Sequence, residues 1–388
     1  MRVAALRGPY LLPVALFFGT FAWSFVYVSL PFHIQRMSRA DAVTTLQWTG
    51  WILGITPLVT VLTAPVWGRY AGRGNPKGWY VLVEVLQAIA FVGMALARTL
   101  PELLLARFVL GFMGAASTFA FIIAGRAADP AEVRRQVAAV QSAMTVGQVL
   151  GPLAGAIAAA QIGFRPSFIL GSLILFGCAS LVRWGVPSPV GPAAARAVER
   201  RTRWRDVAAT ALVVLAGSTQ VFFLAAILPQ ILPDLGVAAG KTLEMGGFLL
   251  FASGVAAAVG AMATPRLGEV FSERRLVATL LVTSSLFLAA LAAVSSVWVY
   301  GVVRFLQVLS IAPVFPLVVA RIAQNASGEA IGVVNSARIG AAFVGPVVAT
   351  SLLAWTSPLV LYVGLGLLGV ACVPLAAVRE RALPRGTA

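Results

Sequence analysis

Charged residues are scarce in this chain: Asp, Glu, Lys and Arg make up 11% of it, against about 25% in a typical soluble domain. Hydrophobic residues make up 60%, and the mean hydropathy is +0.92. This balance excludes an ordinary soluble protein and predicts an integral membrane protein. The apolar stretches are continuous and do not alternate with polar residues, which argues against a β-barrel and predicts membrane-spanning helices.

Groups for catalysis and metal binding are equally scarce. The chain has one histidine and two cysteines, and Cys178 and Cys372 both lie in apolar stretches. This excludes the common metal, triad and thiol sites, and a disulfide framework. A full Walker-type loop, Gly-x4-Gly-Lys-Ser/Thr, is absent, so ATP does not drive the protein directly. We expect a protein that is not an enzyme and that uses no cofactor and no metal.

Basic residues outnumber acidic ones, and the net charge is +16. In a soluble protein this excess would suggest nucleic-acid binding, but here the Lys and Arg residues lie in short segments between apolar stretches. With the N-terminus inside, 21 of them fall on the inner side and 5 on the outer side. The positive-inside rule therefore predicts an inner (cytoplasmic) membrane protein with both termini in the cytoplasm. We expect no nucleic-acid partner.

Twelve apolar stretches are long enough to span a bilayer, and the first is interpreted as a retained span because it is too long for a signal peptide. The predicted spans are about 9–32, 44–67, 78–97, 100–124, 136–160, 166–187, 206–231, 242–264, 275–296, 298–321, 330–355 and 357–378.

The two halves of the chain carry matching landmarks. Three pairs recur at spacings of 194, 194 and 197 residues: Pro152 and Pro346, Cys178 and Cys372, and Arg107 and Arg304. Such a parallel repeat predicts an all-α membrane protein with twelve transmembrane helices in two pseudo-symmetric six-helix bundles. The predicted domains are a first bundle at 1–187, a cytoplasmic linker at 188–205 and a second bundle at 206–388.

A stripe of glycines marks the fifth span. Gly147, Gly151 and Gly155 recur every four residues around Pro152, so they share one helix face, on which a neighbouring backbone can approach closely. We expect this face to be the packing surface between the two halves, and plain helix packing within the membrane is the alternative. Gly345 and Pro346 are the corresponding elements of the eleventh span.

At this point the sequence resembles the major facilitator superfamily over its whole length. The loop Ala64–Lys77 is similar to the family's Gly/Asp/Arg-rich loop, with Gly68, Arg73 and Lys77 as matches. Gly72 stands where the family usually has an aspartate that helps to lock the halves together. Arg107, followed by Gly111 and Gly114, is similar to the family's arginine motif, and the glycine stripe with Pro152 resembles the motif of its drug antiporters. The resemblance implies a twelve-helix drug:proton antiporter that works by alternating access, with these loop and stripe residues in gating.

Charges inside spans are costly, so each needs a reason. Arg107, Arg304 and Arg338 are expected to anchor substrate; the alternative is structural bonding to backbone carbonyls at helix breaks. Polar or aromatic neighbours complete the predicted substrate site, and these are Gln307, Asn335, Gln220, Phe21, Trp23 and Trp51. The first span holds no acidic residue, which favours anionic or neutral amphiphiles over cationic drugs.

Proton carriers are few. Glu244, near the outer end of the eighth span, is the preferred candidate if it faces the cavity. Glu84 lies in the third span, which is usually peripheral in this fold, so a structural role is favoured. His33 titrates in a useful range but, at the outer end of the first span, is more simply an interfacial anchor.

The sequence thus predicts a secondary transporter, acting as a monomer, whose partners are a small-molecule substrate, protons and membrane lipids. Its expected activity is proton-coupled efflux of lipophilic or amphipathic compounds. One alternative is a uniporter or flippase for an anionic solute or lipid, whose phosphate or carboxylate would pair with the arginines. Another is a sensor that kept the fold and lost transport.

Overall fold

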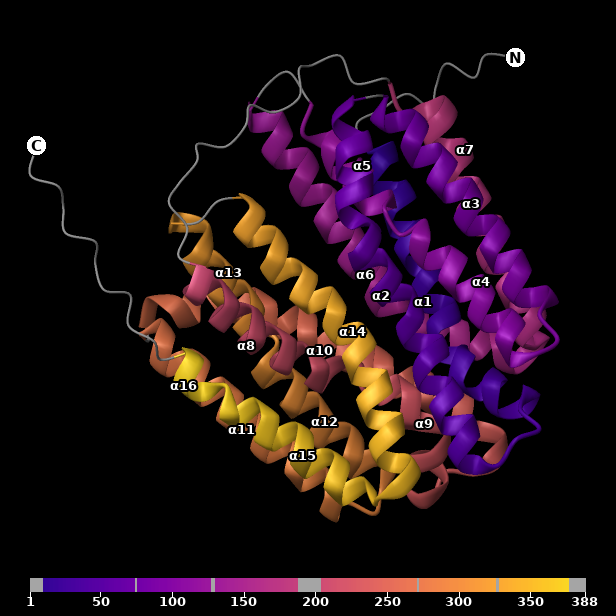
Figure 1. Cartoon of the computed structure of the whole chain (residues 1–388), viewed down its shortest axis with the longest axis vertical. Helices are drawn as coiled ribbons and strands as arrows, with labels where there is room; N and C mark the ends of the chain where they lie inside the picture. Colours follow the sequence, from indigo (N-terminus) through magenta and orange to yellow (C-terminus); the bar gives the residue numbers. More distant parts are fainter. Residues whose placement is uncertain are drawn as a thin grey trace, which may run out of the picture.

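The computed structural model describes residues 10–73, 75–126, 130–187, 204–270, 272–325 and 328–376. Within these ranges the regular structure is helical, and twelve segments are long and apolar enough to cross a membrane. The prediction of an all-α protein with twelve spans is therefore confirmed. Figure 1 shows the helices of the first half, indigo to magenta, beside those of the second half, salmon to yellow. Both chain ends and residues 188–203 of the predicted linker lie outside the described residues.

The first six spans contain seven helices, because the fourth span is divided. Their bounds are α1 (Leu11–Met37), α2 (Ala42–Arg73), α3 (Pro76–Leu96), α4 (Leu100–Phe112), α5 (Ala116–Ala124), α6 (Pro130–Ile162) and α7 (Phe164–Gly185).

The second six spans are divided more often. Their bounds are α8 (Trp204–Phe222), α9 (Leu224–Asp234), η2 (Ala239–Lys241), α10 (Thr242–Val270), α11 (Glu273–Ala290), η3 (Leu291–Ala293), α12 (Val297–Ile311), α13 (Val314–Asn325), α14 (Gly328–Trp355), α15 (Pro358–Ala371) and α16 (Val373–Ala376).

One expectation about continuity was wrong. The segment from Ala64 is not a loop, because α2 continues as helix to Arg73, so Gly68 and Arg73 lie on that helix. The seventh span is present as predicted and consists of two helices: α8 ends at Phe222 and α9 begins at Leu224. No glycine or proline marks this break, and a buried arginine of another span occupies two of the freed carbonyls, as described below.

The helices cross the membrane in alternating directions, which defines two ends of the bundle. We call the end that holds Gly185 and Trp204 the linker end, and the end that holds Met37 and Ala42 the far end. At the linker end Lys77 Nζ, on the first turn of α3, donates a hydrogen bond to the Val186 carbonyl just after α7. At the far end Arg165 Nη2 donates to the Ala97 carbonyl at 3.0 Å.

Within the first half α1 packs along α6 and α7, and α3 packs on α7; within the second half α14 packs on α8, and α11 on α12 and α15. Two extensive pairings join the halves, α2 with α14 and α6 with α10. Both pairings combine one helix from each half, so they form the boundary at which any movement between the halves takes place.

Candidate functional site

The pairing of α2 with α14 depends on two glycines of α2. A Cβ atom added at Gly50 would lie 3.2 Å from the Pro346 carbonyl oxygen and 3.2 Å from Val347 Cα, and it would overlap the Thr350 side chain. One turn on, a Cβ at Gly54 would lie 2.8 Å from the Phe343 ring. The two backbones therefore meet closely only because α2 carries no side chain at these positions.

The pairing of α6 with α10 has the same construction. A Cβ at Gly247 of α10 would lie 3.0 Å from the Pro152 carbonyl oxygen and 3.5 Å from Leu153 Cα, and it would overlap the Ala156 side chain. Two turns on, a Cβ at Gly254 would lie 3.3 Å from Val149 Cα.

These two pairings are related by the sequence repeat. Gly247 follows Gly50 by 197 residues, the spacing of the two arginine landmarks. Pro346 follows Pro152 by 194 residues. The other residues met by these glycines, Val347 and Thr350 in one pairing and Leu153 and Ala156 in the other, are related by the same interval. A glycine of one half thus meets the proline-containing turn of the other half twice, and the two contacts form a pseudo-symmetric seam.

The glycine stripe of α6 does not lie in this seam. Cβ atoms at Gly147, Gly151 and Gly155 would all meet α1 of the same half; at Gly151 the nearest would be Ser24 Cβ at 2.6 Å and the Phe21 carbonyl oxygen at 2.8 Å. The expectation of a stripe between the halves is corrected accordingly. The geometric reason is that 3.6 residues per turn place the stripe and the seam-facing residues of α6 on different faces.

Gly345 shows the same division of faces in the second half. A Cβ at Gly345 would lie 3.1 Å from the Phe223 backbone nitrogen, at the break between α8 and α9. The next residue, Pro346, presents its carbonyl to Gly50 across the seam. In both halves the glycine therefore packs within its own bundle, and the proline that follows it faces the other bundle.

Arg107 is buried on α4 and is bonded to α2. Its Nε donates to the Ile52 carbonyl at 3.2 Å and its Nη2 to the Leu53 carbonyl at 3.4 Å. Pro57 lies four residues after Leu53 and has no N–H, so the Leu53 carbonyl lacks its helical donor. The guanidinium takes the place of that donor. Thr56 Oγ1 donates in return to the Arg107 carbonyl at 2.8 Å.

Arg304 is buried on α12 in a larger network. Its Nη1 donates to the Gln220 carbonyl at 2.7 Å and to Gln307 Oε1, and its Nη2 donates to the Val221 carbonyl at 2.8 Å. The guanidinium also lies over the Phe223 ring, 5.0 Å from its centroid. The two carbonyls belong to the last turn of α8, so Arg304 stabilises the break in the seventh span.

The side chains of Gln220, Gln307 and Ser284 close this network. Ser284 Oγ donates to Gln220 Oε1 at 2.7 Å, and Gln307 Nε2 donates to Ser284 Oγ at 2.7 Å. Gln220 Nε2 reaches Ser285 Oγ and the Leu365 carbonyl, each at 3.2 Å. All are buried, so the predicted residues Gln220, Gln307 and Arg304 are brought together, in the interior of the second bundle.

Arg338 on α14 differs from both. It is half-buried, its Nε is 3.4 Å from Oδ1 of the exposed Asn335, and its guanidinium lies 5.0 Å from the Phe315 ring centroid. It therefore keeps more of its hydrogen-bonding capacity for another partner than the other two arginines do.

The predicted aromatic residues likewise differ in their surroundings: some pack inside the first bundle and one lies at the seam. Trp23 Nε1 donates to Gln87 Oε1 at 2.7 Å inside the first bundle, and Phe21 stacks on Phe17 with ring centroids 6.0 Å apart. Trp51 is 48% exposed, and its ring centroid lies 5.8 Å from that of Phe343 on α14. Of these residues, Trp51 is the one that reaches across the seam.

Sequence reasoning missed Gln87 and Ser284. Gln220 follows Trp23 by 197 residues, and Ser284 follows Gln87 by 197 residues, so the two hydrogen-bonded pairs are repeat mates. Applying the arginine spacing to every polar residue within the spans would have found them.

The two candidate carboxyl groups lie in opposite environments. Glu84 is buried on α3, with Oε1 3.3 Å from where a Cβ at Gly19 of α1 would lie and with Oε2 lacking a hydrogen-bond partner. Glu244 is exposed, one turn before Phe248, whose ring meets the exposed Trp298 ring at 6.1 Å. The preferred candidate, Glu244, is thus the exposed one, and Glu84 is the buried one.

His33 lies apart from these groups, at the far end of α1. Its side chain is buried against α7, and its ring centroid is 5.1 Å from that of Phe164. It faces neither the seam nor the buried arginines, and its surroundings are considered below.

Comparison with known proteins gives the family. Residues 12–240, more than half of the chain, match the Major Facilitator Superfamily. The chain is 24% identical over 326 residues to the multidrug resistance protein MdtG of Citrobacter koseri, which covers 80% of this chain and 78% of that protein.

Solved structures show the same fold. The nucleoside transporter NupG superposes with a TM-score of 0.75 at 11% identity and covers 96% of this chain and 99% of its own. The human organic anion transporter MFSD10 superposes with a TM-score of 0.69 at 16% identity, covering 95% and 98%. With twelve spans and this match, the chain belongs to the Major Facilitator Superfamily, a family of membrane transporters and not of enzymes.

Proposed function

We propose that this transporter exports lipophilic or amphipathic compounds in exchange for protons. The observation that carries the proposal is Trp51, a large aromatic side chain that is 48% exposed where α2 meets α14 of the other half. An exposed ring at a seam between two moving bodies can stack on a ligand without selecting a particular polar group. The name of the relative in Citrobacter koseri, a multidrug resistance protein, supports the same substrate class.

The moving bodies in this proposal are 1–187 and 206–388, joined by the linker 188–205 within one monomeric chain. Alternating access would open and close the two ends of the seam in turn. The positive-inside count supports a cytoplasmic position for the linker end and both termini, in an inner membrane. Gly50 and Gly247 would form the axis of the movement, because each lets the backbones meet at a proline carbonyl of the other half.

Glu84 carries the proton in this proposal. Its carboxyl group is buried against α1, and one oxygen has no hydrogen-bond partner. Gln87, one turn further along α3, bonds to Trp23 of α1. A change of protonation at Glu84 would therefore act on the contact between α3 and α1, and through the glycine stripe on α6, which reaches the seam.

The test is transport of a neutral lipophilic dye into inverted vesicles with an imposed proton gradient. We expect Glu84→Gln to abolish gradient-driven accumulation while dye binding to the purified protein persists, and the matched variant Glu244→Gln to transport like the wild type. Normal transport by Glu84→Gln would overturn the assigned carrier. Failure of the wild type to move any neutral dye, with or without the gradient, would overturn the export of lipophilic compounds.

A second candidate function rests on Arg338. Since this guanidinium is half-buried and holds one long hydrogen bond, it can pair with a carboxylate or phosphate of a substrate. The chain would then carry an anionic solute or lipid as a uniporter or flippase. Gradient-independent flux of an anionic dye, lost in Arg338→Gln and retained in Glu84→Gln, would favour this function over proton-coupled export.

A further inference from the structure

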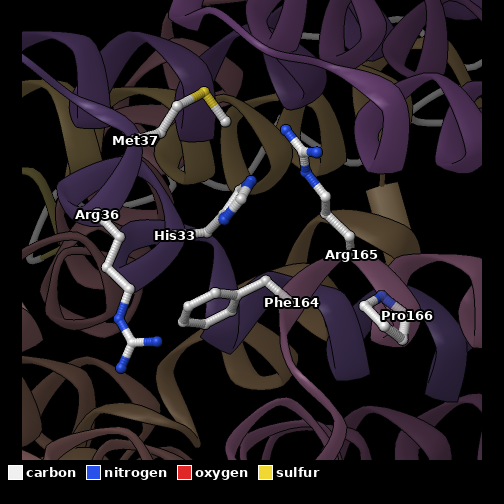
Figure 2. Close-up of a pocket in the computed structure, with 6 residues that line it drawn as sticks. All are labelled: His33, Arg36, Met37, Phe164, Arg165 and Pro166. Carbon is white, nitrogen blue, oxygen red and sulfur yellow. The ribbon is translucent and has the colours of Figure 1, made fainter.

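A hollow of about 400 Å³ lies at the far end, between the last turn of α1 and the first turn of α7. Its lining is basic and aromatic, and the residues are His33, Arg36, Met37, Phe164, Arg165 and Pro166. Figure 2 shows the His33 ring and the Arg165 guanidinium beside one another, with the Arg36 guanidinium directed away, past the Phe164 ring. The hollow contains none of the seam residues and none of the buried arginines described above.

His33 is the first sign that this hollow receives a ligand. Its side chain is 7% exposed, and its Nε2 has no hydrogen-bond partner. The ring is held by Phe164 and Phe168, with centroids 5.1 and 5.3 Å away. A buried polar group without a partner is costly, so a ligand oxygen that accepted a hydrogen bond from Nε2 would be stabilising.

Positive charge is the second sign. Arg36 and Arg165 are two of the five basic residues assigned to this end, and both line the same hollow. In the described part of the chain neither forms an ion pair, and Arg165 bonds to one backbone carbonyl, that of Ala97. The remaining guanidinium donors match the oxygens of a phosphate.

The start of α7 adds backbone donors to the side-chain ones. The residue before this 22-residue helix, Gly163, makes no side-chain cap, so two backbone N–H groups, those of Phe164 and Arg165, lie at the positive end of the helix dipole; Pro166 has no N–H, and that of Ser167 bonds to the Gly163 carbonyl. Phe164 and Arg165 both line the hollow.

An apolar surface continues from the hollow toward the middle of the membrane. Ile169, Leu170 and Leu173 follow Pro166 at helical spacing on α7, and all three are exposed, Leu173 by 60%. A free anion would make no contact with this apolar surface, whereas the acyl chains of a lipid would cover it. The combination of a hollow lined by His33 and two arginines with an adjoining apolar face therefore favours a phospholipid.

We propose that this hollow binds the head group of an anionic phospholipid in the leaflet at the far end. The head-group phosphate lies between His33 Nε2 and the Arg165 guanidinium, and Arg36 adds positive charge from the other side of Phe164. The acyl chains lie along the exposed face of α7. Because both arginines interact with a negative charge, lipids without a compensating amine bind best.

The test is native mass spectrometry of the full chain in detergent, titrated with short-chain phosphatidylglycerol, phosphatidylcholine or inorganic phosphate. Arg165→Gln and His33→Phe each remove a donor, and the second keeps the ring volume between the phenylalanines. Lys241→Gln is the matched control, since it removes one exposed basic charge at the same end in the other half.

We expect phosphatidylglycerol to bind about tenfold more weakly to Arg165→Gln and to His33→Phe, the loss of one charge-assisted or buried hydrogen bond. Lys241→Gln should bind like the wild type, and phosphatidylcholine more weakly than phosphatidylglycerol. Unchanged binding in Arg165→Gln, or an equal loss in Lys241→Gln, would overturn the site. Inorganic phosphate that displaced the lipid at equal concentration would show a site for free anions and overturn the lipid assignment. Should His33→Phe not fold, Arg165→Gln decides.

Discussion

The two pairings that join the halves are built from corresponding residues, yet one side chain sets them apart. In the pairing of α2 with α14, the side chain of Thr350 packs directly on Gly50. In the pairing of α6 with α10, the side chain of Ala156 packs directly on Gly247. Thr350 Oγ1 also donates to the Pro346 carbonyl at 2.9 Å. The backbone geometry of the seam is thus preserved between the halves, and its chemistry is not. One side of the seam carries an extra hydroxyl at its closest approach.

The buried arginines show the same divergence on a larger scale. Arg304 serves a closed network of amides and hydroxyls around a helix break, while Arg107 is bonded to two carbonyls of one neighbouring helix at longer distances. The two halves therefore share the position of a buried arginine in the sequence repeat. They differ in which neighbouring helix that arginine stabilises. Two pairs of substitutions and two single ones, ordered by expected effect, test how far the halves differ.

Replacing the arginines should give the largest contrast. Arg304→Met leaves the Gln220 and Val221 carbonyls and Gln307 Oε1 without their donor. A buried acceptor without a partner costs about 1–3 kcal/mol, so we expect a loss of about 3–5 kcal/mol. Arg107→Met removes two longer hydrogen bonds and should lose about 1–3 kcal/mol by the same rule. Denaturant unfolding in detergent measures both, and equal losses would show that the two networks are equivalent.

Filling the glycines should give the next contrast. A Cβ at Gly151 meets Ser24 Cβ at 2.6 Å and two backbone atoms of α1 at 2.8 and 2.9 Å, whereas at Gly345 the closest approach is 3.1 Å. Overpacking costs about 1–3 kcal/mol, and we expect Gly151→Ala in that range and Gly345→Ala below about 1 kcal/mol. Thermal unfolding of the purified variants gives the comparison. A larger loss in Gly345→Ala would contradict the tighter packing of the first half.

Thr350→Ala makes the two sides of the seam alike. We expect a loss of about 0.5–1.5 kcal/mol, the net worth of one hydrogen bond, together with faster hydrogen exchange in α2 around Gly50. Exchange in α10 around Gly247 should stay at the wild-type rate and serves as the internal control. Faster exchange on both sides would mean that the two pairings open together.

Gly177→Ala should have the smallest effect on stability, and it should raise stability where the other substitutions lower it. A Cβ at Gly177 of α7 meets nothing within 4 Å, and Ala is favoured over Gly within a helix by up to about 1 kcal/mol. A slightly higher unfolding temperature is expected. A loss of stability would mean that the losses in Gly151→Ala and Gly345→Ala cannot be attributed to steric overlap alone.

The sequence predicted the twelve spans and the presence of Arg107, Arg304 and Arg338 within them, because length and apolarity are properties of single segments. It did not predict which face of a helix meets which neighbour. The stripe of Gly151 was expected between the halves and lies against α1, and Glu244, the preferred proton carrier, is exposed whereas Glu84 is buried. These outcomes depend on packing between spans that are far apart in the chain. The helix break after Phe222 was not predicted for the same reason, since the carbonyls freed there are bonded by Arg304 of a distant span.

The proline in α2 has a consequence for the order in which this sequence can change. Pro57 leaves the Leu53 carbonyl without a helical donor, and Arg107 provides one from α4. A chain with Pro57 and no Arg107 would bury an orphan acceptor, whereas in a chain with Arg107 and no Pro57 the Leu53 carbonyl could accept from both the guanidinium and a helical N–H. The loss of Arg107 is therefore costlier while Pro57 remains. Descendants of this chain would lose Pro57 first.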